Sequence, residues 1–87
     1  MDISDWRKKI DSIDQEVLRL LNERARSAHE IGKIKETTHA PIYEPDRERT
    51  IFAKLHESNH GPLTNEDITQ IYTQIIAIMR ELQTRPE

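Results

Sequence analysis

The chain has 87 residues, of which 34% are apolar and 33% are charged, and its formal net charge is −3. A chain of this length forms one domain, here residues 1–87, and buries only a modest fraction of its surface when it folds alone. We therefore expect a partner subunit to supply part of the apolar burial. The lack of cysteine excludes disulfides and thiolate metal sites. Interleaved acidic and basic residues argue against nucleic acid as the main partner.

No stretch of the sequence has the pattern of a membrane span or an export signal. A span needs ~20 predominantly apolar residues, and no apolar run approaches that length. Residues 1–14 are charged and lack the apolar segment of a signal peptide. We expect a soluble, cytoplasmic protein with no membrane partner.

The N-terminal part of the chain has the apolar spacing of one long helix. Apolar residues recur at alternating steps of three and four, at Ile3, Trp6, Ile10, Ile13, Val17 and Leu20. The stripe resumes at Ala28, Ile31 and Ile34, flanked by Leu18, Leu21 and Ala25. This pattern predicts a helix over residues 5–37 with Ser4 as its N-cap. At ~1.5 Å per residue this helix is about 50 Å long, which exceeds the diameter of a compact monomer of this size. One chain therefore leaves part of the stripe uncovered, and we expect a second copy to cover it.

A glycine lies inside this predicted helix. Gly32 costs about 1 kcal/mol relative to alanine at an interior helical position. We interpret it as a point where another helix approaches closely, in preference to a direct ligand role.

Two shorter helices are predicted after a connection at residues 38–43. Pro45 favours the first turn of a helix, and this second helix is expected to end near Asn59. Thr64 and Asp67 have the spacing of a capping box. The third helix carries an apolar stripe formed by Ile68, Ile71, Tyr72, Ile75, Met79 and Leu82. Because no strand pattern is present, the predicted fold class is all-α, with three helices per chain.

Two cationic residues occupy positions where the apolar spacing of the long helix predicts core residues. Continuing the spacing of three and four leads to Arg24 and, further on, to Lys35. They are eleven residues apart, hence only ~20° around the axis and ~16 Å along it. Either one alone is typical of a charge that reaches solvent or pairs with an acid such as Glu23 or Glu48. Together they predict a site for a small anion.

Arg7 is a weaker candidate for the same site. It lies seventeen residues before Arg24, ~25 Å along the helix and about 100° around it. It therefore cannot reach the same ligand within one straight helix. If Arg7 contributes, it does so from the partner subunit.

Further polar residues cluster near the proposed anion site. Arg47 and Glu48 open the second helix, and with Glu44 they form a polar group beside the short connection. Gln83 follows Met79 by one helical turn and extends the apolar stripe of the third helix with an amide. Each of these residues is also compatible with a capping or surface role.

The string from His56 to His60 matches the zinc protease motif H-E-x-x-H. That chemistry needs both histidines on an intact helix, together with a third ligand and a substrate cleft. Here the second histidine abuts Asn59 and Gly61, where the helix is expected to end. We interpret the match as accidental and expect no metal and no cofactor.

Four segments in order carry a family resemblance: W-R-K-K-I-D-S-I-D-Q-E-V-L-R-L-L-N-E-R, E-I-G-K-I-K, P-I-Y-E-P-D-R-E-R and I-I-A-I-M-R-E-L-Q. Together they closely resemble the AroQ-type, all-helical chorismate mutases, over nearly the whole chain. The resemblance implies three helices per subunit and an intertwined homodimer with two equivalent sites. It also implies the isomerisation of chorismate to prephenate in phenylalanine and tyrosine biosynthesis.

The resemblance implies a role for each candidate cation and amide. Arg24 and the Arg7 supplied by a second copy would hold the two carboxylates of chorismate. Lys35 would contact a carboxylate and the ether oxygen of the breaking bond. Gln83 would donate a second hydrogen bond to that oxygen.

The acids and the remaining positions follow from the same resemblance. Glu48 would accept a hydrogen bond from the ring hydroxyl, with Glu44 near it where some members have aspartate. Arg47 would face the ligand or orient the acids. Met79 stands where many members have a serine that binds a carboxylate, which implies weaker substrate binding.

Two alternatives remain open at this point. An isochorismate-pyruvate lyase has a similar fold and cationic site. The other alternative is a non-catalytic or regulatory dimerisation module. Mutase domains occur fused to prephenate dehydratase, prephenate dehydrogenase or DAHP synthase. These enzymes are also the expected macromolecular partners.

Overall fold

The computed structural model describes residues 1–86, and within them the chain forms three helices and no strand. They are α1 (Ile3–Thr38), α2 (Pro45–Ser58) and α3 (Asn65–Leu82). The predicted all-α class and the number of helices are confirmed. The C-terminal residue, Glu87, lies outside the described residues.

Helix α1 begins two residues earlier than predicted, and its N-cap is Asp2 and not Ser4. The Asp2 carboxylate accepts a hydrogen bond from the backbone N–H of Asp5, and the Asp5 carboxylate accepts one from the N–H of Asp2. Such reciprocal bonds satisfy two helix-end donors at once. A cap at Ser4 would place Arg7 three residues on, and an arginine cannot accept the second bond.

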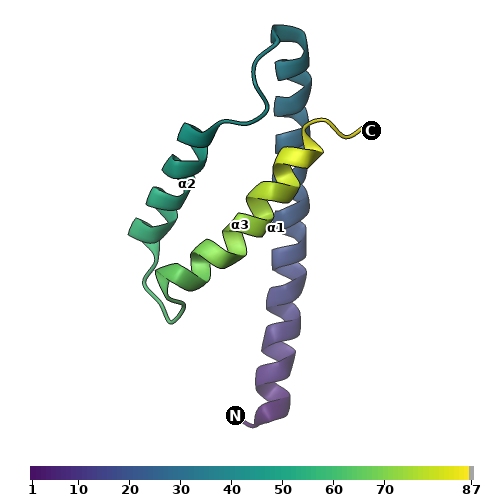
Figure 1. Ribbon diagram of the computed structural model, residues 1–87. Coiled ribbons are helices and arrows are strands. Elements are labelled where there is room, and N and C mark those ends of the chain that lie inside the picture. The colour runs from purple at the N-terminus through teal and green to yellow at the C-terminus, as the bar shows by residue number, and fades with distance from the viewer. Residues whose placement is uncertain (87) are drawn as a thin grey trace.

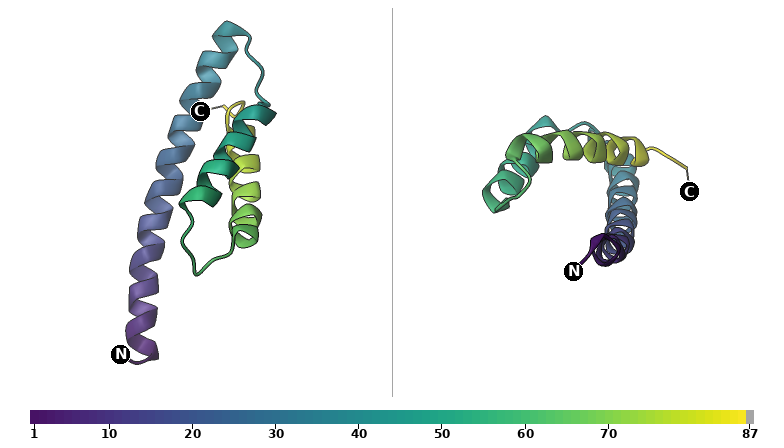
Figure 2. Two further views of the ribbon diagram at one scale, coloured as in Figure 1. Left: turned by 90° about the vertical axis from the view of Figure 1, so that its left-hand side faces the viewer. Right: turned by 90° about the horizontal axis from the view of Figure 1, so that it is seen from below.

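The helices are arranged unevenly around α1 (Figures 1 and 2). Helix α3 packs against the C-terminal half of α1, and α2 packs against α3 without backbone contact to α1. The N-terminal half of α1 extends beyond both of the other helices. The molecule is therefore elongated, with dimensions of 54 × 29 × 15 Å.

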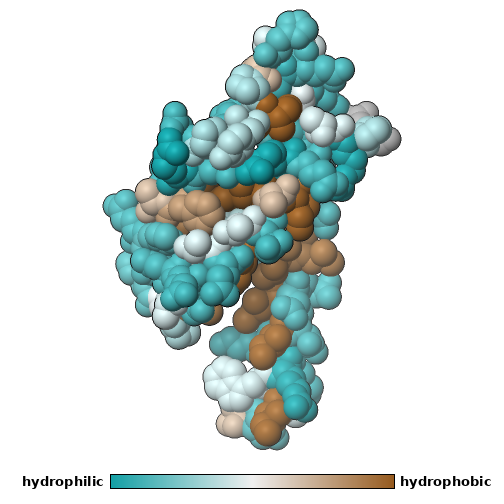
Figure 3. Space-filling view, viewed as in Figure 1, coloured by the Kyte–Doolittle hydropathy of each residue, from teal (hydrophilic) through white to brown (hydrophobic). Residues whose placement is uncertain are grey.

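The apolar stripe on the extended half of α1 faces solvent in this chain. Figure 3 shows it as a brown band along the lower part of the helix. The six residues of the N-terminal stripe are each between 46% and 68% exposed: Ile3, Trp6, Ile10, Ile13, Val17 and Leu20. Exposed apolar surface of this extent on one face typically marks an interaction site.

The buried core lies where α1 and α3 cross. Its residues are Ala28, Gly32 and Lys35 from α1 and Ile76 and Met79 from α3. Some residues of the predicted stripes remain exposed in the single chain. Ile31 and Ile34 of α1 remain 48% and 62% exposed, and Ile71 of α3 is 47% exposed while Ile76 takes the buried position. The reason is that both helices carry apolar residues over a wide arc, and periodicity does not decide which edge faces the chain's own neighbour.

Gly32 lies directly against the C-terminal end of α3. A Cβ atom at this position would stand 2.1 Å from the carbonyl oxygen and 2.7 Å from the Cα of Gln83. The predicted close approach of another helix is confirmed. Because only a glycine allows this approach, position 32 fixes how far the Gln83 backbone lies from α1.

The ends of α2 and α3 follow the predicted signals. Pro45 occupies the first turn of α2, which ends with Asn59 as its C-cap. The Thr64 side chain accepts from the N–H of Asp67, whose carboxylate accepts from the N–H of Thr64, as in a capping box. Within residues 1–86, no helix is long and apolar enough to cross a membrane.

Candidate active site

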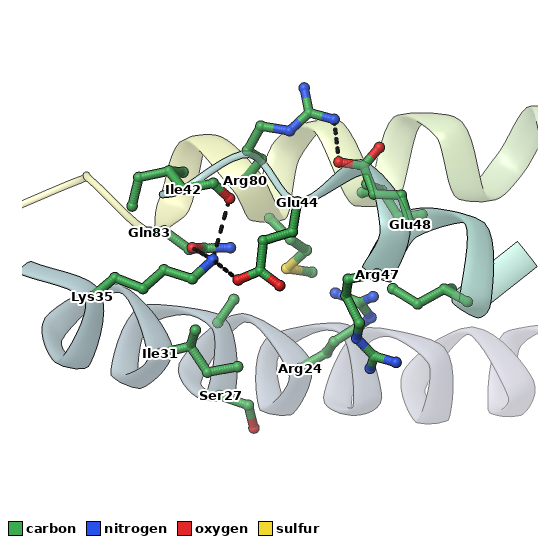
Figure 4. Close-up of a pocket in the computed structure, with 14 residues that line it drawn as sticks. Arg24, Ser27, Ile31, Lys35, Ile42, Glu44, Arg47, Glu48, Arg80 and Gln83 are labelled. Atoms are coloured by element: carbon green, nitrogen blue, oxygen red, sulfur yellow. Dashed lines mark hydrogen bonds and ion pairs between the residues drawn. The ribbon is translucent and has the colours of Figure 1, made fainter. Parts of the chain in front are cut away.

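A cleft of about 340 Å³ opens between α1 and α2, with α3 behind it (Figure 4). Its charged lining residues are four cations, Arg24, Lys35, Arg47 and Arg80, and two acids, Glu44 and Glu48. The charged lining thus carries a net of two positive charges, although the whole chain has a net charge of −3. Five of these six residues were predicted as site residues, and the structure brings those five together.

Lys35 is the buried charge of the cleft, with only 8% of its surface exposed. Its ammonium group donates to Gln83 Oε1 at 2.9 Å and to the carbonyl oxygen of Ile42 at 3.2 Å. It also pairs with a carboxylate oxygen of Glu44 at 2.7 Å. Burial of a charge is tolerated when it is paired and hydrogen-bonded in this way. The result is a fixed positive charge at one end of the cleft, beside the amide of Gln83.

Arg24 and Arg47 lie at the other end of the cleft and extend into the space between α1 and α2 (Figure 4). Within residues 1–86, neither guanidinium group has a hydrogen-bond or ion-pair partner. Each carries up to five N–H donors in a planar fork that matches a carboxylate. Two unpaired guanidinium groups facing one cleft, with an ammonium group further along it, suit a ligand that carries two carboxylates.

Gln83 and Met79 complete the α3 side of the cleft. Because Lys35 donates to the amide oxygen of Gln83, the amide nitrogen is the end of this side chain left to donate to a ligand. Met79 is 7% exposed and offers only a thioether at its position. The lining therefore provides one amide donor and no hydroxyl on this helix.

Arg80 is the charged cleft residue that sequence reasoning missed. Its guanidinium group donates to Glu48 Oε2 at 2.5 Å and stacks 4.6 Å from the centre of the Tyr43 ring. A signal was present, since Arg80 follows the buried Ile76 by four residues and precedes Gln83 by three. A charge at that spacing belongs to the same helix face, by the same criterion that found Arg24 and Lys35.

Arg7 does not lie in the cleft of its own chain. It is exposed on the extended half of α1 and is absent from the cleft lining. The structure therefore agrees with the geometric argument that one straight helix cannot bring Arg7 and Arg24 to the same ligand.

The two histidines of the H-E-x-x-H string do not lie on one helix. Helix α2 ends at Ser58, so His60 lies outside it as predicted. The ring of His56 instead hydrogen-bonds the hydroxyl of Thr69 on α3 at 2.8 Å. Among the described residues, no group of three or more His, Asp or Glu side chains is arranged to hold a metal ion.

The family is decided by comparison with known proteins. The model of the family described as chorismate mutase type II matches residues 6–84. The chain belongs to this family. A bifunctional chorismate mutase/prephenate dehydratase of Aquifex aeolicus is 42% identical over 88 residues, which cover 97% of this chain and 24% of that protein.

Two solved structures show the same fold at similar identity. A chorismate mutase of Thermus thermophilus (form II) is 35% identical with a TM-score of 0.94, covering 98% of this chain and 97% of that one. A chorismate mutase of Helicobacter pylori in complex with prephenate is 34% identical with a TM-score of 0.86, covering 93% and 88%. By contrast, the chain spans about a quarter or less of the length of the bifunctional relatives that it matches.

Proposed function

We propose that the chain is a chorismate mutase domain that converts chorismate to prephenate. The observation that carries the proposal is the buried Lys35, held beside the amide of Gln83 at one end of a cleft whose other end presents unpaired Arg24 and Arg47. This layout matches a dicarboxylate whose ether oxygen gains negative charge as it reacts. Membership of the mutase family and the likeness to a mutase bound to prephenate support the same reaction.

The reaction is an intramolecular Claisen rearrangement, in which one C–O bond breaks as one C–C bond forms. No nucleophile and no covalent intermediate with the protein is required. The protein accelerates such a step by holding the dianion in its compact, reactive conformer. It also places fixed positive charge where the ether oxygen becomes negative.

Each site residue predicted from the sequence has a role in this proposal. Arg24 binds a carboxylate, and Lys35 and Gln83 donate to the ether oxygen as its negative charge grows. Glu48 accepts from the ring hydroxyl. The side chains in supporting positions are Glu44, which holds the Lys35 ammonium group, Arg47, which faces the ligand, and Met79, which packs against it.

The proposed active form is a homodimer in which the second copy supplies Arg7. One chain leaves the N-terminal stripe of α1 exposed, and its cleft lies between α1 and α2, which have no backbone contact with each other. A second α1 covering this stripe can bring its own Arg7 to the cleft, which a single helix cannot do. We further propose a cytoplasmic location and, by analogy with the bifunctional relatives, a prephenate dehydratase domain as fusion partner.

The proposal is tested by following loss of chorismate absorbance and identifying the product, on protein whose size is measured in solution. We expect prephenate, whereas salicylate with pyruvate would identify a lyase acting on isochorismate. Lys35→Ala is expected to lower kcat by about 100- to 1000-fold, the usual cost of losing one preorganised charge of this kind. Lys54→Ala, which removes an exposed lysine of α2, is the matched control. A Lys35→Ala rate near that of the control would contradict the proposal.

A further inference from the structure

Arg80 has no role among the residues assigned above, yet it forms part of the cleft lining. It reaches from α3 to two other parts of the chain. Its guanidinium group bonds Glu48 in the first turn of α2 and stacks on Tyr43 in the connection between α1 and α2. Glu48 lines the cleft, and in Figure 4 its carboxylate is turned toward Arg80 and away from α1.

The bond to Arg80 uses one oxygen of the Glu48 carboxylate and leaves the other. Oε2 accepts from Arg80, and within residues 1–86 no protein donor reaches Oε1. The two side chains are 37% and 23% exposed, so the pair is partly removed from water. Hydrogen bonds between two ionised groups are short and directional. The contact therefore fixes the direction in which Oε1 accepts a hydrogen bond.

The guanidinium group of Arg80 is positioned by protein contacts and not by solvent. Its Nε atom is buried and has no hydrogen-bond partner among the described residues. An arginine that served only solubility would leave this donor in water, because a buried unpaired donor is unfavourable. Glu48 on one side and the Tyr43 ring on the other are thus the contacts that set the position of the guanidinium group.

We propose that Arg80 is a positioning residue: it holds Glu48 by Oε2 so that Oε1 accepts the hydrogen bond of the ring hydroxyl of the substrate. This inference rests on the proposed mutase function. It makes Arg80 a determinant of specificity for a ring substituent that can donate a hydrogen bond. Arg80 also compensates the negative charge of Glu48, which would otherwise repel a dianionic substrate.

The two effects of Arg80 separate in steady-state kinetics. Arg80→Lys keeps the positive charge but loses the planar fork, so we expect a lower kcat with little change in KM. Arg80→Gln loses both, so we expect a lower kcat and a higher KM. The expected fall in kcat/KM for Arg80→Gln is about 10-fold or more, the usual cost of removing a group that orients a functional side chain. Arg49→Gln, which breaks an exposed ion pair with Asp46 on α2, is the matched control.

The decisive readout is discrimination between chorismate and an analogue whose ring hydroxyl is O-methylated. Arg80→Gln is expected to lower kcat/KM more for chorismate than for the analogue, because the analogue has no hydrogen to donate and loses only the charge compensation. In the background of Glu48→Gln, adding Arg80→Gln is expected to change nothing further. If Arg80→Gln does not unfold cooperatively, Arg80→Lys carries the same comparison.

The possible outcomes distinguish this inference from the proposed function. Three results would overturn the inference alone. They are an equal fall in kcat/KM for chorismate and the analogue, additive effects of Arg80→Gln and Glu48→Gln, and rates of the Arg80 variants equal to that of the Arg49→Gln control. Absence of chorismate turnover by the unsubstituted chain overturns the proposed function and the inference with it.

Discussion

The two halves of α1 share one periodic pattern but have opposite surroundings. The C-terminal half packs on α3, buries Ala28, Gly32 and Lys35, and provides the wall of the cleft. The N-terminal half carries an equally regular apolar stripe that no other part of the described chain covers. Since both halves have the same helical signal, the spacing of apolar residues identifies a face suited to packing and does not tell what packs on it. We infer that the first half serves assembly and the second half serves chemistry.

The largest effect is expected from charges placed in the N-terminal stripe. The double substitution Ile13→Asp and Val17→Asp buries two unpaired carboxylates if a second chain covers this face, which is strongly destabilising. We expect loss of the dimer and of nearly all mutase activity, measured by sedimentation and turnover at matched concentration. Gln15→Asp, on the opposite face of the same exposed half, should leave both unchanged. A monomer with full activity would show that the two halves do not divide the work in this way.

Mixing two inactive variants tests whether the halves of α1 from different chains meet at one site. Arg7→Ala and Arg24→Ala dimers should each be strongly impaired, because every site lacks one guanidinium group. In a mixed dimer one of the two sites recovers both arginines, so an equal mixture that exchanges subunits should regain about a quarter of the wild-type rate. No recovery after verified exchange would place Arg7 outside the site.

Gly32→Ala is expected to affect catalysis more than folding. The added methyl group helps the helix by about 1 kcal/mol, but it collides with the Gln83 backbone and must push it away from α1. A displacement of about 1 Å can lower kcat by about 100-fold. Thermal unfolding and kcat should be measured together, with Glu36→Ala on the exposed side of α1 as the control. Wild-type kcat in Gly32→Ala would show that Gln83 tolerates the shift.

The smallest effect is expected at Met79. Met79→Ser adds a hydroxyl donor at a buried position of the cleft, and a hydrogen bond to a carboxylate typically contributes about 1.5–3 kcal/mol. Lost packing offsets part of this gain, and because it costs about 2 kcal/mol of folding stability, it should lower Tm by roughly 10 °C. We expect KM for chorismate to fall several-fold with kcat little changed. An unchanged or higher KM would show that the substrate carboxylate does not approach position 79.

The sequence predicts the helices well because their ends carry local signals. Pro45 and the pair formed by Thr64 and Asp67 act within one turn, so the structure follows them closely. Ser4 was the exception, because a better reciprocal cap two residues earlier competes with it. Local chemistry of this kind can be read without knowing the tertiary structure.

The site was only partly predictable, because its geometry depends on contacts between distant residues. Arg24 and Lys35 stand out as charges on an apolar face, and the structure places both at the cleft. The link from Lys35 to Glu44, Ile42 and Gln83 spans up to 48 positions of the chain, and no local pattern shows it. Arg80 was missed for the same reason, since its importance lies in Glu48 on another helix.

The contrast between the acidic chain and its cationic cleft has a consequence for how a dianion is captured. At physiological ionic strength, charges are screened over about 8 Å. A substrate approaching from a distance therefore meets a surface whose overall charge slightly repels it, and it feels the attraction of the cleft only at close range. The on-rate then depends on collisions near the opening and gains little from long-range steering. Added salt should weaken retention of the bound dianion more than it slows the encounter.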